Sequence, residues 1–338
     1  MMKALFIGLG SIGQRHLRNL LRIAPNTVVS AYRRSRSVPV LSDSNQVIAG
    51  ANIAQHYGLT EFDSIGASLS TNPDLIFITN PSNMHCEIAM RALDTSAHIF
   101  IEKPLSGSWK GVEELAKKEC ALGEKRIALG YQFRFHPALR LVAEMLQENR
   151  IGQVVGARLV NGEYMPGWHP YEDYRSGYAA RRELGGGALV TQIHDFDCAM
   201  WLFGKPTSVF AVGGHLSSLE IDVEDSVQVL MSVPYAGKSL PVSISQDYLQ
   251  WPPKRDLSIV GQDGRIDCDL MRNVVSLTNR PLGKEERHDF PGFVRNSAFV
   301  DLMRNFLAFA EGKEEPVVDL LGGMASLRVA LAARIHWT

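Results

Sequence analysis

The amino-acid sequence predicts an α/β protein in two parts: a Rossmann domain with a doubly wound parallel sheet, then an α+β domain with a mostly antiparallel open sheet. Up to about residue 125, short apolar runs alternate with helical stretches, as in proteins that connect buried parallel strands through helices. A glycine-rich turn follows the first of these runs. Beyond residue 125, longer segments with strand character follow one another with few helices between them, which favours an antiparallel sheet.

The strands of the first part are short and apolar. Four runs have this character: KALFIG (3–8), TVVSAY (27–32), DLIFIT (74–79) and HIFIE (98–102). Amphipathic helices are predicted in SIGQRHLRNLLRI (11–23) and NMHCEIAMRALDT (83–95), because the connections between buried parallel strands are usually helical. Residues 35–66 are less periodic, and only a helix near IAQHYG (53–58) is expected there.

We place the domain boundary near residue 125, with a dinucleotide-binding domain over 1–125 and a substrate-binding and oligomerisation domain over 126–338. The second part opens with a strand in RIALGYQF (126–133) and a helix in HPALRLVAEMLQENR (136–150), where Pro137 suits the first helical turn. Longer strands are predicted in QVVGARLVNGEY (153–164), SVFAVGGHL (208–216), DSVQVLMSVPY (225–235), LPVSISQDYL (240–249) and DLSIVGQDGRIDCDL (256–270). One helix (186–204) is expected before the last four, and two (293–313 and 320–337) after them.

Composition narrows the classes of partner. The chain has 338 residues, 45% of them apolar, and a formal net charge of -1, so it lacks the positive excess that holds nucleic acid or an anionic membrane. No segment near the N-terminus is long enough for a signal peptide or a membrane span. The four cysteines are scattered and form no metal-binding pattern, which favours buried thiols, a reducing cytoplasm and no metal.

The glycine-rich turn GLGSIG predicts a dinucleotide site. Gly8 suits a tight turn, Gly10 lets the backbone approach a diphosphate, and Gly13 allows close packing of the helix on the strand. Ser11 and Ile12 complete the helix N-terminus, where diphosphate charge is stabilised. A tight turn without a ligand is the alternative.

The second strand ends in basic residues. An NAD-binding unit usually places a carboxylate there for the ribose 2′-hydroxyl, but this chain has Arg33, Arg34 and Ser35. Two arginines can bind a 2′-phosphate through charge-assisted hydrogen bonds. The sequence therefore favours NADP(H), with NAD(H) and a solvated basic loop as the alternative.

Polar residues also follow the runs 74–79 and 98–102. Asn80, Pro81 and His85 follow the first, and Glu102 and Lys103 end the second. Because doubly wound sheets bind ligands at the carboxyl ends of their strands, all five are candidates for cofactor contact. Lys103 could also hydrogen-bond and polarise a substrate hydroxyl, as a partly buried lysine with a shifted pKa does. A strand that simply ends at the surface is the alternative for the Lys-Pro pair.

Five segments in order, GLGSIGQRH, NPSNMHCEIAMRAL, IFIEKPLS, GYQFRFHP and GGGALVTQIHDFD, resemble the Gfo/Idh/MocA oxidoreductases, the glucose-fructose oxidoreductase and inositol dehydrogenase family. The resemblance covers essentially the whole chain, and the Glu-Lys-Pro triplet is its most specific local mark. It implies that Lys103 contacts the reacting hydroxyl and that Glu102 lies near the nicotinamide and ribose. It also implies that His194 is catalytic and in contact with substrate.

One family feature is missing. Many members have an aspartate four residues before the histidine, where this chain has Val190. Thr191 is a candidate for substrate contact but cannot act as a base at neutral pH. His194 could take the hydroxyl proton, and Asp197 could orient its ring from one helical turn away. Asp195 and Asp197 are otherwise expected at the helix surface or behind the reacting groups.

The segment EYMPGWHPYEDYRSGYAARRE (163–183) is rich in aromatic and charged residues. Its candidates for binding a sugar ring, a phosphate or a carboxylate are Tyr164, Trp168, His169, Tyr174 and Arg175. A packing role at an oligomer interface is equally compatible with this composition. By family position Arg134 meets substrate or cofactor, whereas Phe133 and Phe135 are expected to pack.

These features predict a cytoplasmic NAD(P)-dependent oxidoreductase that acts on a secondary alcohol or ketone of a sugar, a sugar derivative such as a nucleotide sugar, or a cyclitol. A homodimer or homotetramer is expected, because one face of the second sheet is free to pair with another subunit. Two alternatives remain open. One is a glycoside hydrolase that uses bound NAD transiently, and the other is a non-catalytic regulator that senses the dinucleotide.

Overall fold

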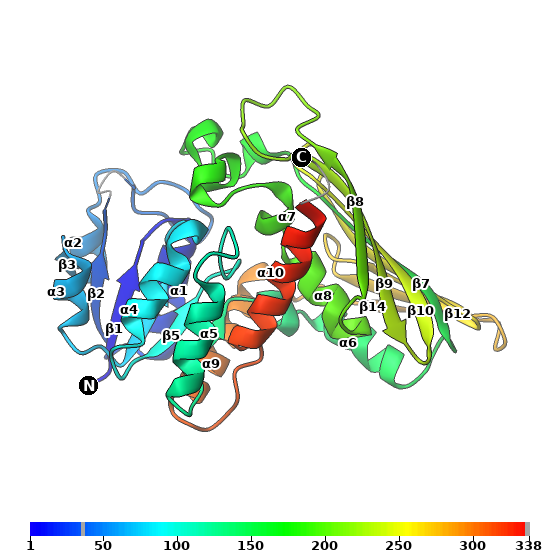
Figure 1. Ribbon diagram of the computed structural model, residues 1–338. Coiled ribbons are helices and arrows are strands. Elements are labelled where there is room, and N and C mark those ends of the chain that lie inside the picture. Colours follow the sequence, from blue (N-terminus) through cyan, green and yellow to red (C-terminus); the bar gives the residue numbers. More distant parts are fainter. Residues whose placement is uncertain (35–37, 335–338) are drawn as a thin grey trace.

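In the computed structural model, which describes residues 1–34 and 38–334, the first six strands form one parallel sheet (Figure 1). They are β1 (Lys3–Ile7), β2 (Val28–Tyr32), β3 (Thr60–Phe62), β4 (Leu75–Ile78), β5 (His98–Ile101) and β6 (Ile127–Leu129). Their order is β3-β2-β1-β4-β5-β6, with every pairing parallel. This order confirms the doubly wound prediction. The direction in which successive strands are added to the sheet reverses between β1 and β4, and such sheets bind ligands at this switch point.

Helices cover both faces of this sheet. The helices α1 (Ser11–Ile23) and α9 (Arg295–Ala310) pack on one face, where Leu17 and Phe306 join the core around Phe6 and Phe77. The helices α4 (His85–Ala92) and α5 (Val112–Ala121) pack on the other. Two short helices, α2 (Ile53–Tyr57) and α3 (Ile65–Leu69), flank β3.

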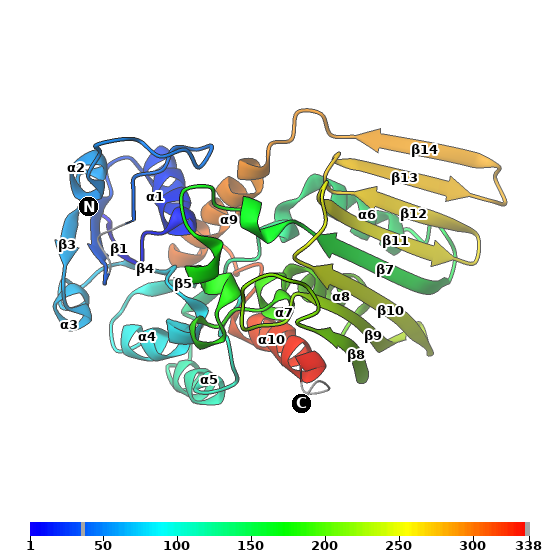
Figure 2. The same ribbon diagram turned by 90° about the horizontal axis from the view of Figure 1, so that it is seen from above.

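An eight-stranded sheet follows, with the order β14-β13-β12-β11-β7-β10-β9-β8 (Figure 2). Its strands are β7 (Val154–Gly162), β8 (Ser208–Gly214), β9 (Ser226–Tyr235), β10 (Lys238–Asp247), β11 (Lys254–Gly261), β12 (Gly264–Asp269), β13 (Val274–Asn279) and β14 (Lys284–Asp289). Only β7 and β10 pair in parallel, so the sheet is mostly antiparallel, as predicted.

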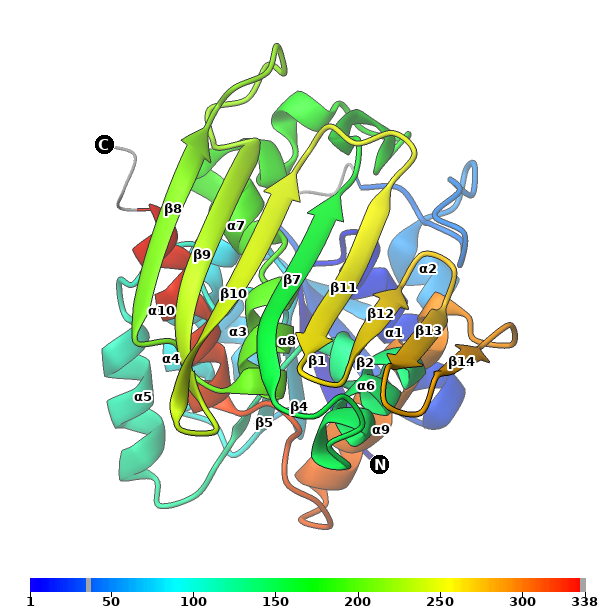
Figure 3. The ribbon, with the colours of Figure 1, turned by 90° about the vertical axis from the view of Figure 1, so that its right-hand side faces the viewer.

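The two faces of the second sheet differ. The helices α6 (Pro137–Gln147), α7 (Ala188–Thr191), α8 (His194–Phe203) and α10 (Leu320–Arg334) pack against one face. The other face is open (Figure 3). Burial alternates accordingly along β9, where Val229 and Met231 are 2% and 1% exposed and Leu230 between them is 51% exposed.

The boundary at residue 125 separates the two parts in the chain but not in space. The strand β6 begins at Ile127 and pairs with β5 at the edge of the first sheet. Leu129 N of β6 also donates to Val318 O at 2.9 Å, and α9 packs on the first sheet from the far end of the chain. Elements from beyond residue 125 therefore complete the first sheet and its core.

The predicted helix over 186–204 is interrupted. It forms α7 and α8, and the break falls at Gln192 and Ile193. Asp195 N donates to Gln192 O at 3.3 Å, so the carbonyl of Thr191 is not used by the bond that a continuous helix would make. That carbonyl is free to accept a side chain from elsewhere.

The strands β13 and β14 were not predicted. The sequence of β14 is KEERHD, which has little apolar character because this strand lies at the edge of the sheet. Charged side chains are common on edge strands because they prevent pairing with other chains. A search for apolar alternation misses such a strand.

None of the helices in the described ranges is long and apolar enough to cross a membrane. All four cysteines are unpaired, and Cys86, Cys198 and Cys268 are buried as expected. Cys120, on α5, is instead exposed.

Candidate active site

The glycine-rich turn joins β1 to α1 in a geometry that needs glycine twice. Gly8 has φ +95°, and a side chain there would lie 2.9 Å from the backbone of Asn80. At Gly13 a Cβ would lie 2.6 Å from Gly8 O and 2.8 Å from Thr79 Oγ1. Nothing lies within 4 Å of a Cβ built on Gly10. The open space beside Gly10 is what a closely approaching diphosphate requires.

Asn80 lies at the same switch point. Both polar atoms of its side-chain amide are buried without a hydrogen-bond partner, although buried amides are normally paired. Thr79 Oγ1 donates to Gly8 O at 2.7 Å and joins the ends of β1 and β4 beside it. Unpaired donors and acceptors next to the glycine-rich turn fit a dinucleotide.

His85 is placed differently from its prediction. It is 1% exposed, and its ring nitrogens lie 2.8 Å from Asn80 O and 2.9 Å from Pro104 O. Burial lowers the pKa of this histidine. His85 therefore links the segments that follow β4 and β5, and both ring nitrogens are engaged by backbone rather than offered to a cofactor.

The basic residues after β2 divide into two environments. Arg33 is 7% exposed, and its Nη1 donates to Glu61 Oε1 of β3 at 2.5 Å. Its Nη2 is buried without a partner. Arg34 is exposed, and Ser35 lies outside the described residues. The guanidinium of Arg33 is thus already neutralised by Glu61, and this pairing was not predicted from the sequence.

Glu102 faces the first domain. Its Oε1 lies 2.6 Å from His16 Nε2 of α1, and its Oε2 accepts the backbone N–H of Lys103 at 2.9 Å. Both side chains are buried. The glutamate therefore fixes the end of β5 against the dinucleotide-binding helix.

Lys103 reaches from the end of β5 to the second domain. Its Nζ donates to the carbonyl of Thr191 at 2.8 Å, the carbonyl that the break between α7 and α8 leaves free. Burial, helped by the positive charges of Arg255 and Arg295, lowers the pKa of Lys103 to about 8, although the charges of Glu102 and Asp195 oppose the shift. A lysine with this pKa can exchange protons near neutral pH.

Thr191 itself is a support for Lys103. Its Oγ1 accepts a hydrogen bond from Tyr248 Oη at 2.9 Å, and the hydroxyl of Tyr178 also bonds to it. The threonine is 6% exposed. Its backbone carbonyl, rather than the predicted side chain, is the part that contacts a candidate catalytic group.

His194 begins α8 and lies three residues beyond Thr191. It is 4% exposed, its Nδ1 is buried without a partner, and its ring lies 4.7 Å from the ring of Phe133. Burial lowers the pKa of His194 well below its usual value, and the nearby charges of Lys103, Arg255 and Arg295 add to the effect. The imidazole is therefore neutral at neutral pH and able to accept a proton.

The two aspartates of α8 are buried and engaged elsewhere. Asp197 accepts two hydrogen bonds from Arg134, at 2.8 and 2.9 Å, so it does not orient His194. Asp195 Oδ2 accepts from Asn161 at 3.0 Å and from Gln246 at 2.7 Å. Burial raises the pKa of both carboxyls. Of the two positions expected for these carboxylates, the helix surface is excluded by their burial, and a position behind the reacting groups stays a prediction.

Arg134 is not free to meet a substrate. Besides its paired bonds to Asp197, its guanidinium lies 4.9 Å from the ring of Trp201. Phe133 and Phe135 are buried, as predicted. Sequence position alone could not reveal that the charge of Arg134 is neutralised inside the second domain.

The aromatic segment from 163 packs largely on itself. Trp168 and Tyr174 lie against a small core that includes Met165 and Tyr248, and the Trp168 and Tyr248 rings are 5.2 Å apart. Tyr164 is exposed. The remaining polar candidates pair with neighbouring carboxylates: Arg175 with Asp173 and Glu220, and His169 with Glu172.

The same segment reaches across to the first domain. Ser82 Oγ donates to Gly185 O at 3.1 Å, and Asn83 Nδ2 donates to Glu183 O. The hydroxyl of Tyr171 bonds to Ser11 in the glycine-rich turn. In Figure 2 the green turns of this segment lie between the two sheets. They cover the carboxyl edge of the first sheet.

Two arginines near the centre were missed by sequence reasoning. Arg255 of β11 places its guanidinium 4.9 Å from the ring of Phe133, and Arg295 begins α9. Their charges act on both Lys103 and His194. The sequence shows only two isolated arginines, 40 residues apart by number, because the fold and not the chain brings them together.

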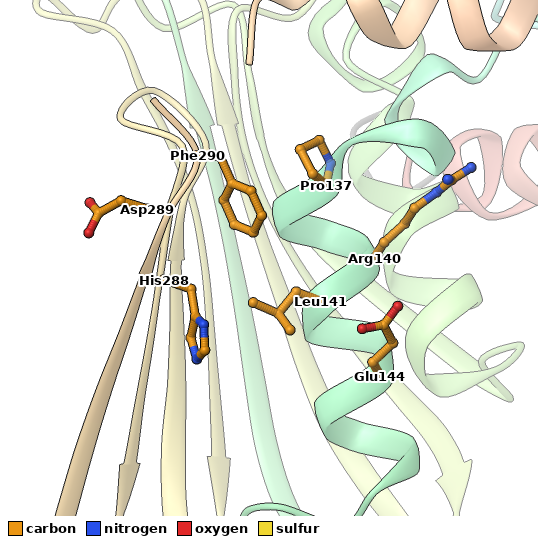
Figure 4. Close-up of a pocket in the computed structure, with 7 residues that line it drawn as sticks. All are labelled: Pro137, Arg140, Leu141, Glu144, His288, Asp289 and Phe290. Atoms are coloured by element: carbon orange, nitrogen blue, oxygen red, sulfur yellow. The ribbon is translucent and has the colours of Figure 1, made fainter. Parts of the chain in front are cut away.

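A separate hollow of about 470 Å³ lies between α6 and β14 (Figure 4). It is lined by Pro137, Arg140, Leu141, Glu144, His288, Asp289 and Phe290. In Figure 4 Phe290 and His288 point toward Leu141, whereas Asp289 points away. None of the predicted site residues lines this hollow. The candidate catalytic residues Lys103 and His194 lie elsewhere, where the first sheet meets the second domain.

Comparison with known families gives a match in each part of the chain. Residues 2–131 match the model described as oxidoreductase family, NAD-binding Rossmann fold. Residues 139–267 match the GFO/IDH/MocA C-terminal domain.

Two curated proteins show similarity over different lengths. Myo-inositol 2-dehydrogenase of Thermotoga maritima is 24% identical over 335 residues, which are 97% of this chain and 94% of that protein. The 2,7-anhydro-N-acetylneuraminate hydratase of Escherichia coli is 24% identical over 243 residues, which are 71% of this chain and 62% of that protein. The match to the hydratase thus spans less than two thirds of that protein.

A solved structure matches nearly the whole chain. The WlbA dehydrogenase from Bordetella pertussis, in complex with NADH and UDP-GlcNAcA, has a TM-score of 0.78 at 19% identity, covering 98% of this chain and 96% of that one. At this identity the likeness shows a shared fold.

Proposed function

The chain belongs to the Gfo/Idh/MocA oxidoreductase family, and from this premise we propose that it is an NAD(P)-dependent dehydrogenase. Its substrate is a secondary alcohol or ketone of a sugar, a sugar derivative such as a nucleotide sugar, or a cyclitol. One observation carries the proposal. Lys103 donates to the carbonyl of Thr191, three residues before His194, and burial lowers the pKa values of both side chains, so that the lysine titrates near pH 8 and the imidazole is neutral at pH 7.

The residues around the glycine-rich turn suit a nicotinamide dinucleotide. Gly10 leaves room for the diphosphate, and α1 begins there without a side-chain cap, so its first backbone N–H groups are available. The unpaired amide of Asn80 lies next to Gly8. When bound, the dinucleotide supplies the hydride acceptor or donor.

In the oxidation direction, Lys103 and His194 divide the work on the substrate hydroxyl. The ammonium of Lys103 donates a hydrogen bond to the hydroxyl oxygen and stabilises the negative charge that develops there. His194, neutral because its pKa is low, accepts the hydroxyl proton. In the reduction direction, the same imidazole returns a proton to the carbonyl oxygen. Val190 stands where many family members have an aspartate, and its side chain cannot accept a hydrogen bond from Lys103. The carbonyl of Thr191 accepts that bond instead and positions the lysine.

We propose NADP(H) as the preferred cofactor, with NAD(H) as the alternative. Support comes from the exposed Arg34 and from the unpartnered Nη2 of Arg33. Glu61 opposes the preference, because its carboxylate already pairs with Arg33 and would repel a 2′-phosphate. Arg34 therefore carries most of the predicted discrimination.

We further propose that the open face of the second sheet pairs with another copy of the chain. Exposed apolar side chains gather there, among them Val212 at 59%, Leu230 at 51% and Val260 at 44% exposure. Contiguous exposed apolar surface is typical of protein interfaces.

The test is a scan of NADPH, NADH and their oxidised forms against sugars, nucleotide sugars and inositols, followed optically at the nicotinamide. The Lys103→Ala variant should lower kcat by about 10²- to 10⁴-fold on any substrate found. The matched control is Lys110→Ala, because Lys110 is exposed and contacts none of the groups above. Full activity of Lys103→Ala would refute the catalytic role. Release of free sugar without net cofactor turnover would instead identify a glycoside hydrolase.

A further inference from the structure

Arg255 lies in a stack of side chains that ends at the candidate base. Its guanidinium carbon is 4.9 Å from the ring centroid of Phe133, and that ring is 4.7 Å from the ring of His194. Arg255 is the second residue of β11, and its side chain is only partly buried. The guanidinium is therefore held in place by an aromatic ring while part of it stays accessible.

Arg295 approaches from another element. It is the first residue of α9, and α9 packs against the short helix Gln132–Phe135 that carries Phe133. Its side chain is exposed. The charges of Arg255 and Arg295 are felt at both Lys103 and His194, so the guanidinium groups border the reacting centre from two sides of the domain junction.

Both guanidinium groups lack a partner. Neither one forms a hydrogen bond or an ion pair with any residue that the structure describes. Among the neighbouring arginines, Arg134 is neutralised by Asp197, whereas Arg15 of α1, which the charge of Arg295 also affects, donates to the amide oxygen of Asn296 at 3.1 Å. Two free guanidinium groups at one centre leave positive charge uncompensated there.

Among the described residues, no nearby carboxylate forms an ion pair with Arg255 or Arg295. Glu102 lies against His16, and Asp195 accepts from the neutral amides of Asn161 and Gln246 while the charge of Arg255 acts on it from a distance. Glu163 is exposed, and it acts on Arg295 without forming an ion pair. The uncompensated charge also makes the ammonium of Lys103 less stable. A neutral polyol would not compensate the positive charge of Arg255 and Arg295, whereas an anionic substrate would.

We propose that Arg255 and Arg295 bind an anionic group of the substrate, so that the enzyme acts on acidic sugars. The group is a carboxylate or a phosphate, since the planar guanidinium binds both through paired hydrogen bonds. This inference rests on the proposed dehydrogenase function, whose substrate it narrows. The two guanidinium groups fix the end of the substrate that does not react.

The experiment compares matched neutral and anionic compounds in the presence of cofactor. Glucose is set against glucuronate for the carboxylate arm, and against glucose 1-phosphate for the phosphate arm. UDP-glucose, whose diphosphate is itself anionic, is compared with UDP-glucuronate, which adds a carboxylate, to test the two groups together. We expect the anionic members to be turned over with higher kcat/KM, and the better arm identifies the group.

Variants then assign the effect to the two arginines. Arg255→Gln and Arg295→Gln should each raise KM for the anionic substrate by about 10- to 100-fold and leave kcat within a few fold, because a charge-assisted hydrogen bond is lost without touching the reacting atoms. Arg265→Gln is the matched control, because Arg265 lies on the neighbouring strand β12 and pairs with Asp267.

Two results would overturn the inference while the dehydrogenase function stands: preference for the neutral member of each pair, or equal losses on neutral and anionic substrates in both variants. If no compound is turned over, the dehydrogenase proposal is not supported, and calorimetric binding to the cofactor-loaded protein decides the inference. Binding of an anionic compound that Arg255→Gln abolishes supports it, and absence of binding by all the anionic compounds contradicts it.

Discussion

Lys103 and His194 have complementary protonation states around neutral pH. The pKa of Lys103 is lowered to about 8, so its ammonium form dominates at pH 7, whereas the pKa of His194 is far enough below its usual value that the neutral imidazole dominates. Alcohol oxidation by the proposed route needs this combination. The active form is lost when His194 gains a proton or Lys103 loses one.

The pH dependence of kcat/KM for alcohol oxidation should therefore show two limbs. Activity should fall on the acid side, below pH 6.5, as His194 is protonated, and on the alkaline side near pH 8 as Lys103 is deprotonated. In Lys103→Arg, which stays charged, residual activity should lose its alkaline limb. An alkaline limb at the same pH in that variant would exclude Lys103 as its source.

The choice between the two cofactors depends on the end of β2. Arg34→Ala should weaken NADPH binding by about 10-fold and leave NADH binding nearly unchanged, because the lost contact is to the 2′-phosphate. Fluorescence titration of the two reduced cofactors measures both values in one protein. Equal losses for NADPH and NADH would contradict the preference for NADP(H).

At the scale of residues, the sequence allowed the candidate site residues to be predicted better than their hydrogen-bond and ion-pair partners. Lys103 and His194 were predicted as a pair, and both lie beside Thr191. Arg134 was predicted to meet substrate, but Asp197 neutralises it. Asp197 lies 63 residues from Arg134 in the chain, and only the fold brings the two side chains together. A single sequence holds no signal for that contact.

At the scale of elements, the turn between β1 and α1 separates two roles of glycine. A Cβ on Gly13 would collide with Gly8 O and Thr79 Oγ1, whereas a Cβ on Gly10 meets nothing within 4 Å. Gly10 also has φ -68° and ψ -171°, which any residue can adopt. A side chain at Gly13 is thus excluded by packing within the protein, whereas a side chain at Gly10 would occupy the space proposed for the cofactor.

Gly13→Ala should lower the free energy of unfolding by about 1–3 kcal/mol, because the crowding outweighs the better helix propensity of alanine. Gly10→Ala should keep the melting temperature of the cofactor-free protein and weaken dinucleotide binding by 10-fold or more, on the order of 1.4 kcal/mol. Thermal unfolding and cofactor titration distinguish the two effects. Unchanged cofactor affinity in Gly10→Ala would mean that the diphosphate does not bind at this turn.

Strands that are buried on both faces were predicted from the sequence, whereas the break in the helix over 186–204 and the charged edge strand β14 were not. The strands β1, β4 and β5 are apolar apart from Lys3 and His98 at the first positions of β1 and β5, because helices cover both faces of the first sheet. No proline marks the break between α7 and α8 in the sequence. The break frees the carbonyl of Thr191, which accepts the hydrogen bond from Lys103, and this contact is visible only in the structure. β14 was missed because its charges belong to an edge.

At the scale of the whole molecule, the proposed pairing of two copies involves the open face of the second sheet. If it pairs with another copy, Leu230→Asp should shift the protein toward monomer in analytical ultracentrifugation, because each interface would bury two carboxylates against apolar surface. Leu282→Asp is the control, since Leu282 is 65% exposed in the turn between β13 and β14. Oligomers of unchanged size in Leu230→Asp would place the interface elsewhere.

The packing of α9 on the first sheet has a consequence for how the chain is made. During synthesis, β1 to β5 leave the ribosome long before α9, yet Phe77 and Phe100 pack against Phe306 of that helix, with ring centroids 5.2 and 5.4 Å apart. Until translation reaches α9, the part of this face that α1 does not cover remains open and exposes aromatic surface. The nascent chain would be most dependent on chaperones in this interval, and a ribosome stalled after β14 would hold a cofactor-binding half that cannot close its own core.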